Sequence, residues 1–165
     1  MQYQTHFGSL DKFEKGTIEL INDNAKHYVF SNVFDVANKS KPYEKVVVGK
    51  NLQYVIEALR AEGDSPWFTA SHDEFAVAME GEIEVNYIKL DDAQKIAPAS
   101  KEGSVRIQGT PPGRKMGVIK LKRGHQALLP VGAAYQFRAK KCGVLLLQTI
   151  LGENSVEKWA EICHQ

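Results

Sequence analysis

The chain has 165 residues, of which 43% are hydrophobic and 25% charged, values typical of one globular domain with a sizeable core. The net charge of +1 gives no electrostatic reason to expect a nucleic acid or an anionic membrane as partner. No apolar run approaches the roughly 20 residues that span a bilayer, and the start of the chain lacks the apolar core of a signal peptide. Together with two widely spaced cysteines, Cys142 and Cys163, these features favour a cytoplasmic protein.

The first third of the chain predicts strands and one helix. His27 to Val36 and Lys45 to Val48 are rich in aromatic or β-branched residues, which favour strands, and Gly49-Lys50 is typical of a turn. From Asn51 to Glu62, apolar residues recur at helical spacing, between a capping asparagine and a terminating glycine. We therefore expect a short helix there, packed against the remaining strands.

Strands dominate the rest of the chain. Glu74 to Glu80 leads through Gly81 into Glu82 to Leu90, where Ile83, Val85 and Tyr87 alternate with polar residues. Such alternation indicates a half-buried antiparallel strand. Further strands are expected at 116–121, 126–129, 135–139 and 144–150. Many short strands joined by glycine turns predict an all-β sandwich or small barrel.

Two segments interrupt this pattern. Asp92 to Lys115 is rich in Ala, Ser, Gly, Pro and Lys, and we interpret it as a long excursion, either functional or a simple insertion. A short helix is expected over 154–163, with Val156, Trp159, Ala160 and Cys163 on one face. The whole chain, residues 1–165, is predicted to form a single domain.

Two motifs resemble the paired motifs of cupin barrels. Glu74 is followed, after six residues, by Gly81, and Gly124 is followed at the expected spacings by Pro130 and Gly132. The glycines permit tight turns, and the Pro-x-Gly bend directs the next inward side chain toward the barrel. The resemblance implies a cupin fold, that is, a double-stranded β-helix or jelly-roll barrel.

The departures from the cupin pattern fall on the metal ligands. The first two histidine positions are held by Trp67 and Thr69, or by Phe68 and Ala70, depending on one residue of spacing. Only the glutamate position is kept, as Glu74, because Tyr135 stands where the last histidine is expected. A catalytic iron, manganese or zinc site needs at least three nitrogen or carboxylate ligands. We therefore expect a degenerate cupin domain without its own metal and without catalytic residues.

Two alternatives stay open. His72 and Glu74, perhaps with His125, offer the two histidines and one carboxylate of an open iron site, which would make the chain a stand-alone metalloenzyme. A metal-free acid–base enzyme using Tyr135 ranks lower, because no matching histidine–aspartate pair accompanies the tyrosine.

Beyond the general cupin pattern, residues 67–90, with the run Glu80-Gly81-Glu82, resemble the small subunit of two-subunit hydroquinone 1,2-dioxygenases. This resemblance implies an Fe(II)-dependent, ring-cleaving enzyme of nitrophenol and hydroquinone degradation, assembled as a hetero-oligomer such as a heterotetramer. The large catalytic subunit would carry the iron and bind the aromatic substrate. The small subunit would hold no cofactor and would support the assembly or a wall of the substrate pocket.

Trp67 is the residue that we expect to contact the partner or the substrate pocket, because tryptophan is enriched at interface hot spots. Phe68 is a second candidate on the same grounds. The alternative for Trp67 is that it fills the interior of its own barrel. The 92–115 excursion could also clasp the partner.

Overall fold

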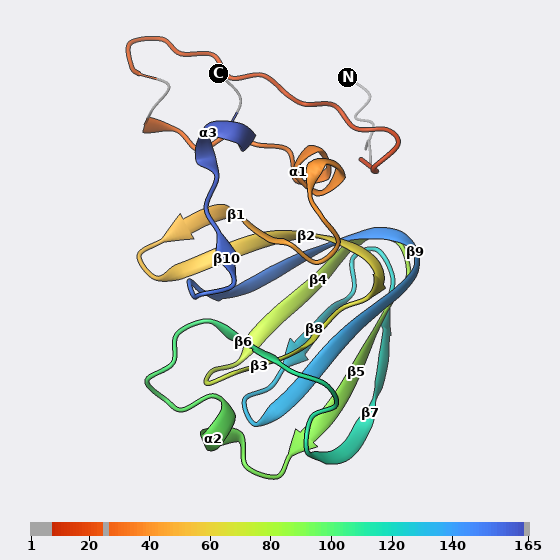
Figure 1. Cartoon of the computed structure of the whole chain (residues 1–165). Coiled ribbons are helices and arrows are strands. Elements are labelled where there is room, and N and C mark those ends of the chain that lie inside the picture. Colours follow the sequence, from red (N-terminus) through yellow and green to blue (C-terminus); the bar gives the residue numbers. More distant parts are fainter. Residues whose placement is uncertain (1–7, 25–26, 164–165) are drawn as a thin grey trace.

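The computed structural model describes residues 8–24 and 27–163, and most of these form one strongly curled sheet (Figure 1). The sheet has two halves that share the longest strand, β9 (Ala133–Ile150). The second part of β9 pairs with one half and its first part with the other. The prediction of an all-β jelly-roll barrel is confirmed.

The first half contains β1 (Lys45–Asn51), β2 (Tyr54–Asp64), β4 (Glu74–Glu80) and β8 (Gln126–Leu129). The strands lie in the order β1-β2-β9-β4-β8, all antiparallel, and the short β10 (Ser155–Val156) adds to β1 in parallel.

The second half contains β3 (Trp67–Ala70), β5 (Ile83–Leu90), β6 (Ser104–Ile107) and β7 (Gly113–Leu121). Its order is β6-β3-β9-β5-β7, with Tyr135 of β9 paired to Phe68 on one side and Tyr87 on the other. The register therefore brings both cupin-like motifs to the same part of the barrel.

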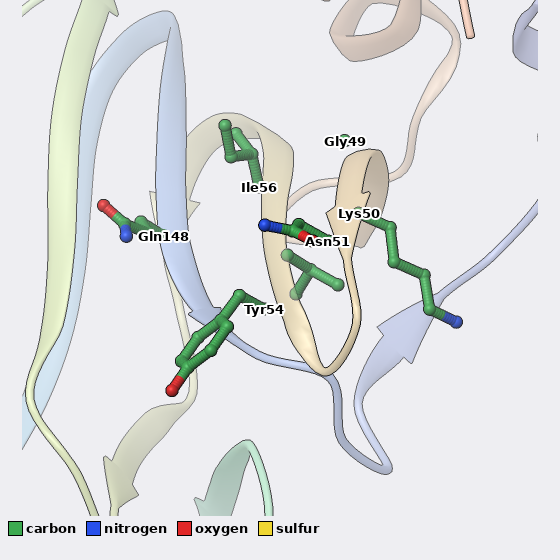
Figure 2. A pocket seen from close by; sticks show the side chains of 7 residues that line it. Gly49, Lys50, Asn51, Tyr54, Ile56 and Gln148 are labelled. Atoms are coloured by element: carbon green, nitrogen blue, oxygen red, sulfur yellow. The ribbon is translucent and has the colours of Figure 1, made fainter. Parts of the chain in front are cut away.

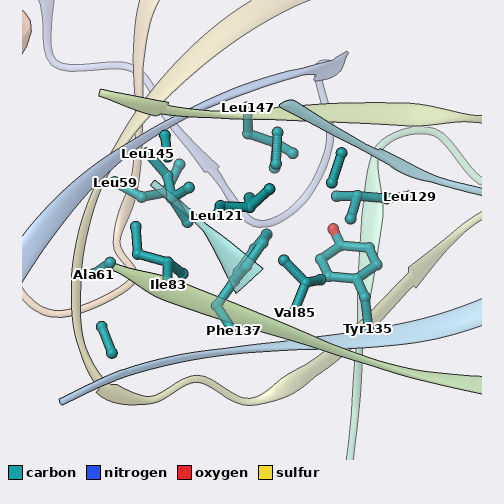
Figure 3. Packing of buried hydrophobic residues seen from close by; sticks show 14 of the residues in the cluster. Leu59, Ala61, Ile83, Val85, Leu121, Leu129, Tyr135, Phe137, Leu145 and Leu147 are labelled. Carbon is teal, nitrogen blue, oxygen red and sulfur yellow. The ribbon is translucent and has the colours of Figure 1, made fainter. Parts of the chain in front are cut away.

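The barrel interior is filled by inward-facing side chains from both halves (Figure 3). Ile83 and Val85 are fully buried and Tyr87 nearly so, which confirms the alternation read in that strand. Every second residue of a strand points inward, so each strand contributes a short row. The largest apolar contributions come from Leu59, Leu121, Leu129, Phe137, Leu145 and Leu147.

Helices cover part of the outside of the first half. In α1 (Val33–Lys39), Phe34 and Val36 face the sheet, and the side-chain oxygen of Asn32 caps the helix by accepting from Phe34 N at 2.9 Å. At the other end of the chain, α3 (Trp159–Ile162) packs Ile162 on the same outer face. Residues 8–24 and 27–32 form an extended arm outside the barrel (Figure 1).

Three sequence predictions for the first third were wrong. Residues 51–62 form no helix but the end of β1 and most of β2, and Gly49-Lys50 lies within β1. The apolar spacing of Val55 and Leu59 fits both periods, and pairing with β1 and β9 decides for a strand. The expected strand at 27–36 is instead part of the arm and the start of α1, where the Asn32 cap outweighs β-branched composition.

The excursion and the C-terminal helix also differ from expectation. Residues 92–115 contain the short helix α2 (Ala93–Ile96), all of β6 and the first residues of β7, so the segment is largely built into the barrel. The C-terminal helix is shorter than predicted, because Ser155 and Val156 pair with β1 before it begins. Cys163 packs against the apolar cluster under α1 and α3, as expected.

Candidate functional site

The centre of the barrel holds a buried carboxylate, that of Glu74 at the start of β4. Tyr135 Oη donates to Glu74 Oε2 at 2.6 Å, and Thr149 Oγ1 donates to Glu74 Oε1 at 2.6 Å. Both hydrogen bonds have the short length typical of a hydroxyl bound to a charged oxygen. Each carboxylate oxygen is thus occupied by a hydroxyl group of the protein itself.

Tyr135 can serve only as a donor here. Burial, and then the neighbouring charge of Glu74, raise the pKa of Tyr135 well above its ordinary value. The phenol therefore keeps its proton and is neither a base nor a phenolate ligand for a metal.

A lysine side chain lies inside the barrel close to this tyrosine. Lys45 is 2% exposed, and its Nζ donates to Ser104 Oγ at 2.7 Å and lies 4.5 Å from the ring centroid of Phe68. The ring face attracts the ammonium electrostatically. The Lys45 amino group thus lies inside the barrel, 6.0 Å from the ring centroid of Tyr135.

Glu57 supplies the negative charge nearest to this lysine. Its Oε2 lies 3.8 Å from Lys45 Nζ, beyond hydrogen-bond distance, while its Oε1 accepts from Ser155 Oγ at 2.6 Å. Burial raises the pKa of Glu57, and the charge of Lys45 partly offsets that shift. The barrel interior therefore contains Lys45, the two carboxyl groups of Glu57 and Glu74, and the hydroxyl groups that hydrogen-bond to them, among apolar side chains.

The three residues of the alternative metal site do not converge. His72 lies before β4 with its Nε2 3.1 Å from Thr149 Oγ1, so it borders the Glu74 network. His125 is exposed in the turn before β8, where its Nδ1 accepts from the backbone of Lys122. Glu74 pairs with Leu129, four residues or about 13 Å along the strand from His125. Within residues 8–24 and 27–163, no group of three or more His, Cys, Asp and Glu could hold a metal ion.

The degenerate ligand positions on β3 are divided between the two faces of that strand. Phe68 points inward and its ring lies 6.0 Å from that of Tyr135, while Thr69 Oγ1 donates to the Ala133 carbonyl at 2.9 Å. Ala70 is buried and has no polar group to offer. Trp67 is partly buried, and alternation along β3 places it on the face opposite Phe68.

Four residues of the polar centre were missed from the sequence: Lys45, Glu57, Ser104 and Thr149. Glu57 was assigned to a helix, which hid its inward position between Val55 and Leu59. Lys45 precedes three valines, so no polar–apolar alternation in the sequence indicated which face of the strand the lysine would take. Nothing in the excursion signalled that Ser104 would reach this site.

Comparison with solved structures identifies relatives of the whole chain. A structure of hydroquinone 1,2-dioxygenase PnpCD in complex with Cd2+ and 4-hydroxybenzonitrile contains a chain 57% identical, with a TM-score of 0.93, covering 99% of this chain and 98% of that one. The chain belongs to the hydroquinone 1,2-dioxygenase family. A structure of the enzyme from Sphingomonas sp. TTNP3 with 4-hydroxybenzoate bound gives 52% identity and a TM-score of 0.96 over 99% of both chains. A scan of protein-family models and a search of curated proteins gave no match.

A second kind of chain in these enzymes shares the fold. In a PnpCD structure with Fe3+, a chain only 12% identical matches 86% of this chain with a TM-score of 0.62, and the match covers 38% of that longer chain. At this identity the likeness shows the fold alone. It is nevertheless consistent with the cupin architecture predicted from the two motifs, which the structure and the full-length relatives confirm.

The residues of this barrel do not fit the metals named for these relatives. The only carboxylate at a cupin ligand position already accepts two hydroxyl hydrogen bonds. The adjacent interior holds an ammonium group, which repels a cation. No step of ring cleavage is therefore assigned to residues of this chain.

Within the described residues, no helix is long and apolar enough to cross a membrane.

Proposed function

We propose that this chain is the small subunit of an Fe(II)-dependent hydroquinone 1,2-dioxygenase, and that it binds no metal itself. The observation that carries the proposal is the pair of short hydroxyl bonds that Tyr135 and Thr149 donate to Glu74. They complete the carboxylate without a metal, and the Lys45 ammonium supplies the positive charge.

The iron and the ring-cleaving reaction belong, in this proposal, to a large subunit of the same enzyme. Iron there would bring hydroquinone and dioxygen together for cleavage to a hydroxymuconic semialdehyde. The small subunit would complete a hetero-oligomer, for example a heterotetramer, in the cytoplasm. Two chains of different length under one enzyme name, both with this fold, support a two-subunit assembly.

Trp67 remains our candidate for a residue that reaches the large subunit or a wall of its substrate pocket. The inward position of Phe68, next to the Tyr135 ring, supports an outward role for Trp67. A partly buried tryptophan on the outer side of β3, next to Pro66, has the rigid apolar area typical of interface anchors.

The test is metal analysis of the chain purified alone and co-expressed with a large hydroquinone 1,2-dioxygenase subunit. We expect no stoichiometric metal in the lone chain, and iron with hydroquinone-dependent oxygen uptake in the complex. About one metal per lone chain, lost in His72→Ala, would instead establish the stand-alone metalloenzyme.

A further inference from the structure

The outward faces of the two sheet halves differ in chemistry. On the second half, outward positions carry ion pairs, such as Lys120 with Glu84 at 3.3 Å and Arg138 with Asp64 at 2.7 Å. The first half has an uncharged region on its outward side. It comprises the outward positions among residues 54–58 of β2, 146–148 of β9, 75–77 of β4 and 126–128 of β8. A charged surface is ordinary for a globular domain, and contiguous exposed apolar area bordered by polar residues is a feature of protein–protein interaction sites.

The register arranges this uncharged surface in two adjacent rows across five strands. One row runs Val46, Ala58, Leu146, Val77, Gln126, and the next runs Gly49, Ile56, Gln148, Phe75, Leu128. The helices α1 and α3 cover the start of the first row, where Val46 and Ala58 are fully buried. The chain thus builds an apolar layer outside the barrel and covers only part of it.

The uncovered remainder is apolar and open. Ile56, Phe75 and Leu128 are 44%, 39% and 45% exposed, although each lies within a paired strand. A hollow of about 550 Å³ is lined by Tyr54, Ile56 and Gln148 (Figure 2). A second hollow, of about 340 Å³, shares Ile56 and Gln148 with the first. We define the outer apolar face as Tyr54, Ile56, Phe75, Val77 and Leu128, together with the amides of Gln126 and Gln148.

We infer that the outer apolar face is the docking surface for the large subunit; this inference rests on the proposed function. The face itself carries no charge, its polar groups are two amides and the Tyr54 hydroxyl, and Lys50 and Asn51 lie at its β1 edge. It is therefore complementary to a mostly apolar protein surface.

Area favours the large subunit over a second copy of this chain. Four strands about 4.8 Å apart and about four residues of 3.3 Å along each give roughly 250 Å², against about 800 Å² per partner in a standard interface. The arm leaves the barrel on the same outer side, since Leu10 and Phe13 pack beside Val144, and its Ile21 is 83% exposed. A partner that covers both the outer apolar face and the arm must extend past α1 and α3 (Figure 1). The longer chain of the PnpCD structure is large enough for this, because only 38% of it matches this chain.

The test uses the co-expressed complex with an affinity tag on this chain. Ile56→Lys/Phe75→Lys places two charges in the face, and Leu128→Lys is an independent variant on another strand. The matched control is Val118→Lys, because Val118 is 43% exposed and lies on β7, the edge strand of the other sheet half, three strands away from Trp67 of β3. Circular dichroism melting of each lone chain verifies folding.

We expect the face variants to retain at least tenfold less large subunit than the wild type, and the control to retain the wild-type amount. Face variants that fold and still bind normally would overturn the inference while leaving the proposed function intact. Failure of the wild-type chain to retain the large subunit would overturn the proposed function. The lone wild-type chain could also form a dimer. If the face variants are monomeric and still retain the large subunit, the face binds a second copy of this chain and the inference is wrong.

Discussion

At the scale of single residues, the barrel centre keeps charge where most barrels of this size are apolar. Burying an ion is costly unless hydrogen bonds and an opposite charge compensate it. Glu74 has two hydroxyl donors, and Lys45 has a serine, an aromatic face and a nearby carboxyl group. These buried polar side chains therefore form one mutually dependent set.

Removing the phenolic hydroxyl of Tyr135 should lower the free energy of unfolding of the chain. Tyr135→Phe leaves Glu74 buried with one hydroxyl donor, and loss of a hydrogen bond to a charged group costs about 1.5–3 kcal/mol of the free energy of unfolding. Urea denaturation of the lone chain measures this loss. The control is Tyr54→Phe, which removes the same hydroxyl from an exposed side chain and should change stability by less than about 0.5 kcal/mol. Equal losses in both variants would exclude a special role for the Tyr135–Glu74 bond.

The lysine and Glu57 should be energetically coupled. Lys45→Met leaves buried carboxyl groups without their cation, and breaking a buried pair costs about 3–5 kcal/mol. Lys45→Met/Glu57→Gln should recover at least half of that loss, because the uncompensated charge is removed as well. A double-mutant cycle by urea denaturation gives the coupling energy. Additive losses would show that Lys45 acts through Ser104 and the aromatic rings instead.

Glu57 also makes the free energy of unfolding depend on pH, in a direction that its pKa shift determines. Burial raises the pKa of Glu57 above its ordinary 4.5, so the folded state holds this proton more tightly than the unfolded chain. The stabilisation from that proton is present below about pH 4.5 and is lost as pH rises through the folded-state value, with a slope of at most about 1.4 kcal/mol per pH unit. Glu57→Gln should flatten that fall in urea-denaturation stability measured from pH 4 upward. An unchanged slope would mean that Glu57 titrates normally.

Residue identity was predictable at this site only where a motif fixed the position. The kept glutamate and the inward tyrosine followed from cupin spacing, and the structure joins them by a hydrogen bond. Lys45 and Glu57 follow no motif, and they enter the centre because β1 and β2 pair beside β9. That pairing depends on contacts distant in sequence, which local periodicity does not contain.

At the scale of elements, predictions succeeded where alternation was strong and failed where two periods overlapped. β4, β5, β7 and β8 were located to within a few residues. β9 was read as two strands, because Lys140 and Lys141 interrupt its apolar pattern at the point where it passes from one half to the other. The helix over 51–62 had the best helical spacing in the chain, and tertiary pairing still overrode it.

The position of the 92–115 segment should depend on a close backbone contact with the residues that follow β9. Gly103 has φ +68°, and a Cβ there would lie 2.6 Å from Gly152 Cα, whereas Gly109 has φ +69° with open space around it. Both Gly→Ala variants introduce left-handed strain of roughly 1–2 kcal/mol, and Gly103→Ala adds a backbone clash. We expect Gly103→Ala to lose at least about 2 kcal/mol more than Gly109→Ala in urea denaturation. Equal losses would mean that β6 and its loop are held by side-chain contacts alone.

At the scale of the whole molecule, the fold was predictable and the extra layer was not. Turn glycines and the Pro-x-Gly bend reveal a barrel because they encode local geometry. The outer apolar face becomes visible only when strand register brings Ile56, Phe75 and Leu128 into one row. In sequence each of these residues is an isolated outward apolar residue, which needs no special explanation.

If the outer apolar face docks the large subunit, binding should also stabilise this chain against heat. Large subunit at a free concentration of about 100 times Kd adds about 2.7 kcal/mol to the free energy of unfolding. For a chain near this size, Tm rises by roughly 2–4 °C per kcal/mol of added stability, so we expect a Tm rise of about 5–10 °C. Calorimetry of the chain with and without large subunit measures the rise. Val118→Lys should gain as much as the wild type, while Ile56→Lys/Phe75→Lys, similarly stable alone, should gain little at the same concentration. A full rise in that double variant would place the interface elsewhere on the molecule, even if the two subunits form the proposed enzyme.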